Sequence, residues 1–503
     1  MNEENSEEFD EHKASEVESS GSSQLLPNAY GVLRGFKAIG YSLAEAISDL
    51  IDNSIDAKAS MAVIQFGRTN NELKFIQVID NGHGIPPNEI DNAMGWGYQS
   101  KKDSKSLGCF GLGMKTAAFS IADSLTVFSK AKDKKAVGRR WTDKNITEKD
   151  WTIEEIDTKI ADAWLAKDYG RIDITKQGTL VQLDNVQEFN IGAGQVNETF
   201  STISKDLHFH LGLHFHRFIE SKKIKIYLTV LNIETGDSLG YSEVQPLNPM
   251  PQKTGNRSYP KKYTLDMEGI GKISLDTYVW PKNSKNPEYR MNGTAANSQG
   301  FYWYRNNRLI NKDGWNRLRD TEPHYSLARA SIDLPPSYDA IFGLQVGKYK
   351  VEPPKLFLNN VFDNAVAKDK SVLRDWIRDS EETYRKKTID PQSNVVYVPS
   401  DGFGSKSQIN NYKKHFVSGD EEIIPIICLS EELDEEKLFE IDIDNFTITL
   451  NKKIIKGISK EKTMTSFKLS LFLLVRDYFG FSTLKKNHIQ ELDDLNKYLL
   501  ETI

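Results

Sequence analysis

The chain has 503 residues, of which 38% are hydrophobic and 27% are charged, a composition typical of globular proteins with sizeable cores. This composition excludes fibrous and fully disordered proteins, and the length predicts about three domains. The most apolar stretch, residues 467–481, is interrupted by charged residues and is shorter than the roughly 20 residues that a membrane span requires. We therefore expect no contact with a membrane.

Cysteine usage and the first residues predict the compartment. The two cysteines, Cys109 and Cys428, exclude a disulfide framework and a four-cysteine zinc module. The N-terminus has neither the basic nor the apolar segment of a secretory signal. Both observations predict a cytoplasmic protein in a reducing environment.

The net charge of -6 is unevenly distributed along the chain. Residues 1–23 contain eight acidic residues and one lysine, so they carry -7 and the remainder carries about +1. Such a segment predicts an acidic, disordered arm over residues 1–24. The nearly neutral body favours no class of partner by charge alone.

Helix and strand patterns alternate over the first 190 residues. Apolar residues at helical spacing predict a helix that begins at Leu43 and presents one apolar stripe. Strands are predicted at 61–66, 73–79, 125–129, 136–141 and 179–183, with a second helix at about 112–121. This mixture predicts an α/β sandwich.

The remaining chain is predicted to form two further α/β regions. A helix at 196–218 separates the first block from a second block, and the sequence VEPPKL places another boundary near residue 360. Strands are expected at 224–230, 272–280 and 301–310, and helices at about 365–387 and 465–478. The expected domains after the arm cover residues 25–190, 191–360 and 361–503.

The first predicted helix carries a strongly acidic polar face. Glu45, Asp49, Asp52, Asn53 and Asp56 all fall opposite the apolar stripe, with no lysine among them. Carboxylates that share one helix face repel each other, so this pattern favours a functional role over a plain solvated face. Oxygen ligands of this kind suit Mg²⁺, which takes one or two protein groups beside substrate phosphates.

A second candidate segment is VIDNGHGI, residues 78–85. Asp80 ends an apolar strand there, and Gly82 and Gly84 let the backbone turn tightly or approach a ligand closely. A strand followed by a glycine turn is common, so this segment alone identifies no chemistry.

A third candidate segment is LGCFGLGMKTAAF, residues 107–119. Gly108, Gly111 and Gly113 precede a predicted helix, an arrangement that points backbone N–H groups at a phosphate. The segment is not a Walker P-loop, because Lys115 comes one place too late.

The order and spacing of these segments resemble the four motifs of the GHKL, or Bergerat-fold, ATPases. The motifs are DLIDNSIDA, DNGHG, GCFGLG and the Gly178–Thr179 pair in KQGTLVQL. This superfamily includes the DNA gyrase B protein, ninety-kilodalton heat-shock chaperones, MutL mismatch-repair proteins, histidine kinases and microrchidia proteins. The resemblance covers about residues 25–190 and implies a Bergerat-fold α/β sandwich that binds ATP with Mg²⁺.

The resemblance also implies roles for the adenine and metal sites. Asn53 is expected to bind Mg²⁺, and Asp80 is expected to accept the adenine amino group. Gly82 and Gly84 would shape the adenine pocket, and Thr179 would support it beside Asp80.

On the phosphate side, the resemblance assigns Gly108, Gly111 and Gly113 to the lid and to the entry of the following helix. Lys115 is expected near the phosphates, with a surface position as the alternative. For Asp56 we expect a structural hydrogen bond within the first motif.

One position departs from the ATP-hydrolysing relatives. They use a glutamate four residues before the Mg²⁺ asparagine to activate water, and this chain has Asp49 there. Because aspartate has a shorter reach, and a misplaced general base forfeits about 10²–10⁴ in rate, slow hydrolysis is expected. Glu45 is the alternative base, but Ser42 and Glu45 match a helix capping box, so we assign the base to Asp49.

The second block resembles the transducer domain of microrchidia-type proteins. Residues 300–315, GFYWYRNNRLINKDGW, contain the run Y-x-N-N-R-L-I that is characteristic there. Residues 342–354 resemble the loop that sends a lysine to the γ-phosphate, and Lys348 aligns best, with Lys350 second. Histidine kinases lack such a domain, so that branch is disfavoured.

Four histidines lie in the segment LHFHLGLHFH, residues 207–216. His210 and His214 have the i, i+4 spacing of a metal pair, but apart from Asp206 no carboxylate or cysteine accompanies them. We predict an interdomain helix that packs its leucine and phenylalanine face.

Together these features predict a slow, Mg²⁺-dependent ATPase that forms a homodimer on ATP binding and acts as a molecular clamp. ATP is expected to close a lid over residues 95–106. The relatives favour duplex DNA as the partner, in genome maintenance or phage defence, and residues 361–503 are a candidate region for a protein partner. Alternatives are a protein-remodelling chaperone and a nucleotide-gated scaffold with little hydrolysis.

Overall fold

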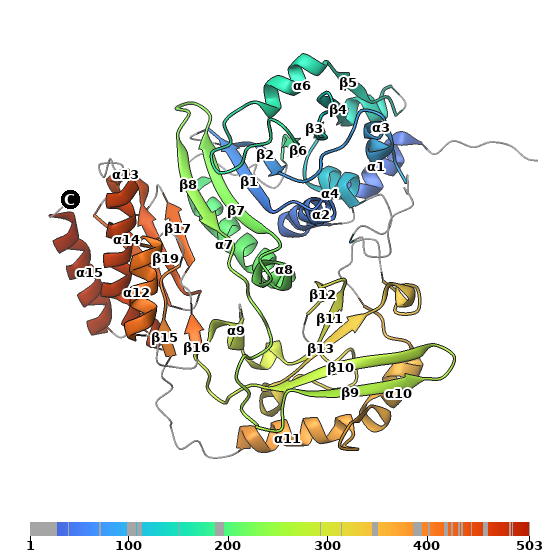
Figure 1. The fold of residues 1–503 in the computed structure, drawn as a ribbon, viewed down its shortest axis with the longest axis vertical. Coiled ribbons are helices and arrows are strands. Elements are labelled where there is room, and N and C mark those ends of the chain that lie inside the picture. The colour runs from blue at the N-terminus through green and yellow to red at the C-terminus, as the bar shows by residue number, and fades with distance from the viewer. Residues whose placement is uncertain are drawn as a thin grey trace, which may run out of the picture.

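The computed structural model describes residues 28–501 apart from 39, 70–71, 98–106, 108–112, 150, 187–195, 292, 313, 345–350, 386–394, 401–402, 417–420, 424–425, 431–432, 434–435, 444, 456–460, 482–483 and 485. The chain forms three units, each built around its own sheet (Figure 1). None of the helices that the structure describes combines the length and the apolar character that a membrane crossing requires.

The first unit, residues 28–244, contains an eight-stranded sheet in the order β5-β4-β3-β6-β2-β1-β7-β8. Neighbouring strands are antiparallel except for β1 and β7, which are parallel. The strands are β1 (Met61–Arg68), β2 (Leu73–Asp80), β3 (Ser124–Lys130), β4 (Val137–Thr142), β5 (Glu154–Ile156), β6 (Gly178–Asp184), β7 (Lys225–Asn232) and β8 (Ser238–Glu243). The helices are α1 (Ala29–Lys37), α2 (Leu43–Asp56), α3 (Ile90–Met94), α4 (Gly113–Ile121), α5 (Asp143–Thr147), α6 (Thr158–Leu165), α7 (Val196–His214) and α8 (His216–Glu220).

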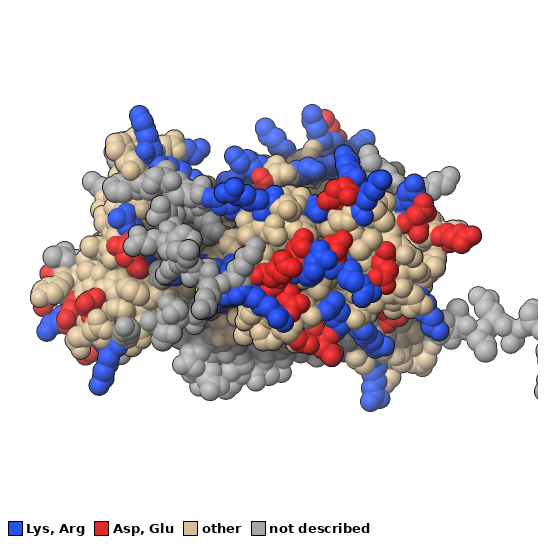
Figure 2. Space-filling model, turned by 90° about the horizontal axis from the view of Figure 1, so that it is seen from below, with Lys and Arg blue, Asp and Glu red and all other residues tan. Residues whose placement is uncertain are grey.

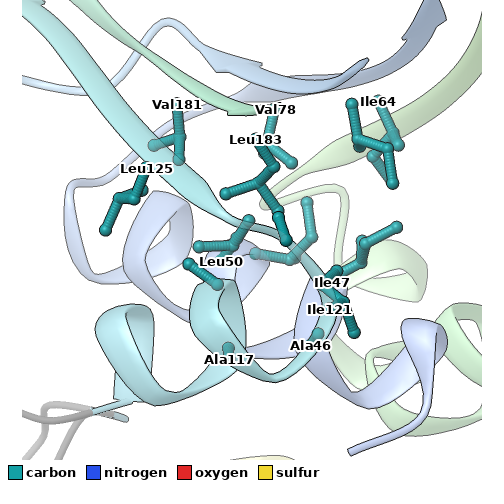
Figure 3. Packing of buried hydrophobic residues seen from close by; sticks show 14 of the residues in the cluster. Ala46, Ile47, Leu50, Ile64, Val78, Ala117, Ile121, Leu125, Val181 and Leu183 are labelled. Atoms are coloured by element: carbon teal, nitrogen blue, oxygen red, sulfur yellow. The ribbon is translucent and has the colours of Figure 1, made fainter. Parts of the chain in front are cut away.

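Helices α2 and α4 lie side by side against one face of this sheet (Figure 3). Ile47 and Leu50 of α2 meet the apolar side chains of the central strands, such as Val78 and Leu183. Each fully buried side chain of this size contributes about 1.5–3 kcal/mol of transfer free energy. This packing fixes α2 with its apolar stripe on the sheet and its acidic face turned away from it.

The start of α2 confirms the predicted capping box. The Ser42 hydroxyl accepts a hydrogen bond from the Glu45 amide, and the Glu45 carboxylate accepts one from the Ser42 amide at 2.8 Å. Both bonds satisfy N–H groups that the first turn of a helix leaves unpaired. Glu45 therefore folds back on the helix start.

The second unit, residues 245–385, contains a six-stranded sheet in the order β12-β11-β13-β10-β9-β14. Its strands are β9 (Lys261–Met267), β10 (Gly271–Val279), β11 (Gly300–Arg305), β12 (Arg308–Asn311), β13 (Ala328–Leu334) and β14 (Val366–Ala367). Its helices are α9 (Pro287–Arg290), α10 (Lys355–Asn364) and α11 (Leu373–Arg385), with short 3-10 turns η3 (Ala296–Ser298), η4 (Pro323–Tyr325) and η5 (Pro336–Tyr338). Trp303 and Trp376 are among the largest side chains buried in its core.

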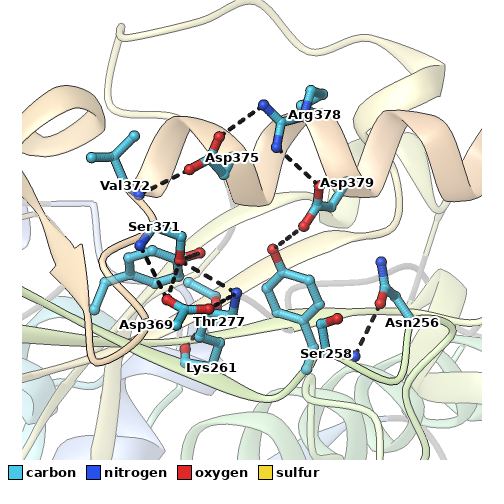
Figure 4. A network of polar contacts seen from close by, with 12 residues as sticks. Asn256, Ser258, Lys261, Thr277, Asp369, Ser371, Val372, Asp375, Arg378 and Asp379 are labelled. Carbon is cyan, nitrogen blue, oxygen red and sulfur yellow. Dashed lines mark hydrogen bonds and ion pairs between the residues drawn. The ribbon is translucent and has the colours of Figure 1, made fainter.

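A polar network fastens α11 and the turn before it to β9 (Figure 4). Lys261 donates to Asp369 at 2.8 Å, a bond that lowers the pKa of the Asp369 carboxyl, and the Tyr259 hydroxyl donates to Asp379 at 2.9 Å. Arg378 forms ion pairs along α11 with Asp375 and Asp379. On the side of the molecule that carries α11, seen from below in Figure 2, basic and acidic residues are intermixed on the surface.

The third unit, residues 395–501, contains a three-stranded sheet in the order β17-β19-β18 and a parallel pair of β15 and β16. Its strands are β15 (Val395–Tyr397), β16 (Glu421–Ile423), β17 (Ile426–Ser430), β18 (Phe439–Asp442) and β19 (Thr447–Asn451). Its helices are α12 (Lys406–Phe416), α13 (Lys452–Ile455), α14 (Glu461–Val475), η6 (Arg476–Gly480) and α15 (Lys486–Leu500). Strand β17 lies beside β8 and α7, and Lys205 of α7 pairs with Asp442 at 3.3 Å.

The α/β architecture and most predicted elements are confirmed, but the breaks between units differ from the boundaries expected near residues 190 and 360. The first sheet continues to Glu243, because β7 pairs with β1 and β8 pairs with β7. The second unit continues to Arg385, because β14 pairs with β9 and α11 packs on the same core. Both differences come from pairing between segments that are distant in sequence, which local patterns do not encode.

The first and second units contact each other through α7, α8 and the second sheet. Leu213 of α7 packs with Tyr302, Tyr304 and Leu309 in one buried cluster. Arg217 of α8 donates to Asp333 and Ser331 of β13 at 2.5 and 2.7 Å and lies over the Tyr304 ring. The helix predicted at 196–218 is therefore interrupted at Phe215 and supplies the interdomain packing that was expected of it.

Candidate functional site

Asp80, the last residue of β2, has a buried carboxylate. Ser54 of α2 donates its hydroxyl to Asp80 Oδ2 at 3.1 Å, and the Gly82 amide donates to Oδ1 at 2.8 Å. Burial raises the pKa of Asp80 to about 6, while the bonds from Gly82 and Ser54 and the charge of His83 lower it. The carboxylate is therefore mainly ionised at neutral pH and can accept a hydrogen bond from a ligand.

Thr179 lies directly opposite Asp80 in the pairing of β6 with β2. Its hydroxyl is 2.8 Å from Ser129 Oγ, which also accepts a hydrogen bond from the Ile85 amide at 2.8 Å. Thr179 thus connects the strand beside Asp80 to the loop that follows β2. The supporting role of Thr179 at an adenine site stays a prediction.

The two glycines of this loop are required by close approach of the chain. A Cβ on Gly82 would lie 2.7 Å from the Cβ of Ala57, just after α2. Gly84 has φ +68°, and a Cβ there would lie 2.0 Å from the carbonyl oxygen of Lys130. A larger residue at either position would displace the loop from α2 or from β3.

Asp49 lies in the middle of α2 and is buried, with its two oxygens facing different groups. Oδ2 accepts a hydrogen bond from the Tyr41 hydroxyl at 3.3 Å. The same oxygen is 3.4 Å from the place of a Cβ on Gly113, the first residue of α4. The carboxylate therefore stands at the N-terminal end of α4, the kind of helix end that attracts phosphate groups.

Arg308 is a residue of the candidate site that was not expected from the sequence. Its side chain is fully buried, with Nε 2.7 Å from Asp52 Oδ1 and Nη2 3.8 Å from Asp49 Oδ1. Because residues 301–310 were predicted as one strand, no tertiary role was expected for it. The structure instead turns the chain at Asn306 and Asn307, both with positive φ, and forms the β11–β12 hairpin. A pair of asparagines is the available signal for such a turn.

Asn53 and Asp56 complete the polar face of α2. Asn53 is half-buried one turn beyond Asp49, and no described residue forms a hydrogen bond with its side chain. An amide oxygen is a ligand that Mg²⁺ accepts beside phosphate oxygens, so Asn53 fits the expected metal role. Asp56 accepts a hydrogen bond from the Leu107 amide at 2.8 Å, so its structural bond reaches outside the first motif.

Lys115 of α4 is directed at the chain that leads into the expected lid. Its buried ammonium donates to the carbonyl oxygens of Ala93 and Gly95 at 3.0 and 2.8 Å. Trp96 follows, and its ring stacks on Phe36 of α1 at 4.9 Å between centroids. In this structure Lys115 therefore holds the start of the lid segment.

Several predicted residues lie outside the described part of the chain. These are the lid residues 98–106, Gly108, Gly111, and the candidate γ-phosphate lysines Lys348 and Lys350. Of the glycines assigned to the phosphate side, Gly113 is described, at the start of α4.

Three of the four histidines of α7 and α8 are buried, namely His208, His214 and His216, and His210 is half-buried. His210 and His214 stack with their ring centroids 3.9 Å apart. Burial lowers the pKa of His208 to about 4 and of His214 and His216 to about 3, so these rings are neutral at physiological pH. Their packing at the unit boundary agrees with the structural role predicted from the sequence.

Comparisons with known proteins find a family match within the first unit. Residues 41–179 match the family described as histidine kinase-, DNA gyrase B- and HSP90-like ATPase. Protein MICRORCHIDIA 1 of Arabidopsis thaliana is 33% identical over 96 residues, which cover 17% of this chain and 14% of that protein. The B protein of type 2 DNA topoisomerase 6 from Saccharolobus islandicus is 34% identical over 97 residues, which cover 17% of this chain and 18% of that protein.

The likeness to these relatives is confined to a short part of each. The alignments span less than a fifth of the length of the curated relatives. Among solved structures, the N-terminal domain of a DNA repair protein aligns with a TM-score of 0.38 at 15% identity, covering 71% of this chain and 98% of that one.

Proposed function

We propose, from the premise that residues 41–179 form a GHKL-type ATPase domain, that this chain is a slow Mg²⁺-dependent ATPase that closes as a homodimeric clamp on duplex DNA. The observation that carries the ATPase proposal is the arrangement around α2. The buried Asp80 carboxylate lies beside one part of this helix, and the Asp49 carboxylate faces the first residue of α4. Helix α2 thus connects a carboxylate that suits the amino group of adenine with a helix end that suits the phosphate groups.

Each residue has a distinct part in the proposed reaction. Asp80 accepts the adenine amino hydrogen bond, and Thr179 holds the strand beside it. Asn53 would hold Mg²⁺, which when bound neutralises charge on the phosphate oxygens. Asp49 takes the proton of the attacking water, and the N-terminus of α4 with its preceding glycines binds phosphate. Lys348 is the proposed γ-phosphate contact from the second unit.

The DNA part of the proposal is supported by the names of the relatives, one of which belongs to a DNA topoisomerase. It does not rely on the α11 side of the molecule, where acidic and basic residues alternate. A duplex requires a surface of mainly positive charge, so we expect it to be bound elsewhere.

ATP turnover with and without duplex DNA, measured over a range of salt concentrations, tests this proposal. DNA should stimulate turnover, and the stimulation should fall as salt rises, because phosphate contacts release counterions. Sedimentation with a non-hydrolysable ATP analogue should show a dimer that is absent without nucleotide. A rate of ATP turnover that is the same with and without DNA at every salt concentration would argue against the DNA clamp.

A nucleotide-gated scaffold is the second candidate. The observation that favours it is the aspartate at the base position, whose carboxylate has a shorter reach than glutamate and is already engaged by Tyr41. ATP-dependent dimerisation without phosphate release under any DNA condition would favour the scaffold over the ATPase. The chaperone alternative predicts instead that ATP suppresses aggregation of unfolded client proteins.

A further inference from the structure

Arg308 connects the second unit to the acidic face of α2. It begins strand β12, and its guanidinium enters the first unit beside Phe215, whose ring centroid is 5.4 Å from Cζ. Its Nε atom is 2.7 Å from Asp52 Oδ1, whereas its Nη2 atom is 3.8 Å from Asp49 Oδ1. Asp52 therefore holds the guanidinium closely, while Asp49 lies beside it at the outer limit of an ion pair.

This arrangement is energetically consequential because all three side chains are buried. Asp49 and Asp52 are one helical turn apart, so their carboxylates would repel each other without a cation between them. A buried charge that loses its partner is strongly destabilised, whereas an exposed ion pair contributes little. The orientation of Asp49 is therefore coupled to a residue of the other unit.

The two oxygens of Asp49 show what the contact does. Oδ1 faces Arg308, and Oδ2 faces Tyr41 and the first residue of α4. Contact with the guanidinium on one side directs the other oxygen toward the end of α4. That end is where the proposed phosphate chain and attacking water would lie.

We propose that Arg308 is a positioning residue for Asp49, so that turnover requires the β11–β12 hairpin to be docked against α2. This inference rests on the proposed ATPase function. It predicts that loss of Arg308 lowers kcat and leaves ATP affinity nearly unchanged, because Asp80 and Asn53, which bind the nucleotide, lie apart from the guanidinium.

The test compares Arg308→Gln with Arg308→Lys and with a docking control in the full-length protein. The control is Arg217→Gln, which removes another ion pair between the same two units, to Asp333 of β13. That pair is partly exposed, and its two residues lie on α8 and β13. ATP affinity is measured by calorimetry, and kcat and KM by phosphate release.

We expect Arg308→Gln to lower kcat on the order of 10²-fold, as for a catalytic group displaced by about an ångström, with KM and ATP affinity little changed. Arg308→Lys should give an intermediate rate, because an ammonium reaches one carboxylate but lacks the fork geometry. Arg217→Gln should keep kcat within about threefold, because a partly exposed ion pair contributes little.

Two outcomes would overturn the inference. If Arg217→Gln lowers kcat as much as Arg308→Gln does, Arg308 acts through docking alone. If Arg308→Gln keeps the wild-type kcat, Asp49 needs no positioning from the second unit. Failure of the wild type to bind or hydrolyse ATP would instead contradict the proposed function itself.

A second variant covers the case in which Arg308→Gln does not fold. Asp52→Asn keeps Arg308 but removes the carboxylate that holds its Nε atom. Without that anchor the guanidinium is no longer held in place beside Asp49, so kcat should fall while ATP affinity persists. An unchanged kcat in folded Asp52→Asn would count against the inference.

Discussion

Helix α2 and the β11–β12 hairpin bring charged groups to the same place from two different units. The acidic groups of α2 lie on one helix, and their spacing along the sequence is enough to place them on the same face. Arg308 comes from another sheet and reaches them through a hairpin turn. The two regions are thus specified in different ways, one by local periodicity and the other by tertiary structure.

The difference suggests a division of labour. In the proposed function, groups on α2 and at the end of β2 supply what nucleotide binding and hydrolysis need within one unit. The hairpin supplies a contact that exists only when two units are docked. Substitutions in the first region should therefore alter binding or chemistry directly, whereas those in the second should alter chemistry alone.

The largest expected effect tests whether α2 carries the chemistry. Asp49→Ala should slow turnover by about 10²–10⁴, the usual contribution of a general base, while ATP binding and dimerisation persist. Asp49→Glu should retain or raise the rate, since glutamate extends the reach of the carboxylate by one methylene. Steady-state phosphate release and calorimetry measure the two effects. Wild-type turnover in Asp49→Ala would show that Asp49 is not the general base.

The next effect tests whether the first unit alone determines affinity. Asp80→Asn should weaken ATP binding by about 10²-fold, because an amide can present a donor where the adenine amino group needs an acceptor. Arg308→Gln serves as the matched comparison, since it should leave affinity unchanged. A folded Asp80→Asn variant with the wild-type dissociation constant would contradict the adenine assignment.

Asp80→Asn should also change stability with a defined dependence on pH. The folded-state pKa of Asp80, about 6, lies above the ordinary aspartate value of 3.8, so the native state carries a cost for ionising this group. That cost is absent below about pH 4 and complete above about pH 6. The variant should therefore unfold with a free energy raised by up to about 3 kcal/mol at pH 8 and little changed at pH 4. Denaturant titrations of the nucleotide-free protein at both pH values measure it.

A smaller effect tests the metal assignment on the same helix. Asn53→Ala should lower ATP affinity about tenfold in the presence of Mg²⁺ and should have little effect in its absence, because one of the few protein ligands is lost. Asn53→Asp is the matched control, since it keeps an oxygen ligand. Calorimetry with and without Mg²⁺ distinguishes the two, and Mg²⁺-dependent affinity that survives Asn53→Ala would assign the metal to another group.

Much of the first unit could be predicted from the sequence because its information is local. Period-two and period-3.6 patterns located the strands and helices, and one helix brings Asp49 and Asn53 to the same face. The capping box could also be read directly, since it involves residues three apart. Asp80 was identifiable through the order and spacing of the four motifs, because its own segment alone identifies no chemistry.

The remainder depended on pairing between distant segments. Nothing local indicates that β7 would pair in parallel with β1, so the first sheet was expected to end too early. Residues 301–310 were predicted as one strand, and Asn306 and Asn307 were not used as a turn signal, so no tertiary role was assigned to Arg308. For Lys115, a phosphate role was expected from its motif position, but the structure directs its ammonium to two carbonyl groups.

The smallest expected effect concerns Glu45 at the beginning of α2. It tests whether this acidic residue has a structural role only. Glu45 shares the acidic face of α2 with Asp49, yet its carboxylate is bonded to the Ser42 amide and hydroxyl. Glu45→Ala should therefore cost about 0.5–2 kcal/mol of stability, as for the loss of a helix cap, and leave turnover per folded molecule unchanged.

Melting temperature and phosphate release, measured on the same Glu45→Ala sample, separate the two roles. Ser42→Ala is the matched control, because it removes the other half of the capping box and keeps the Glu45 carboxylate in the chain. Both variants should lose similar stability and keep the rate. If Glu45→Ala instead loses turnover without losing stability, Glu45 is the base. The catalytic group would then lie one turn nearer the helix start, away from Arg308. Arg308 would have no catalytic carboxylate to position, and the proposed coupling between α2 and the hairpin would be wrong.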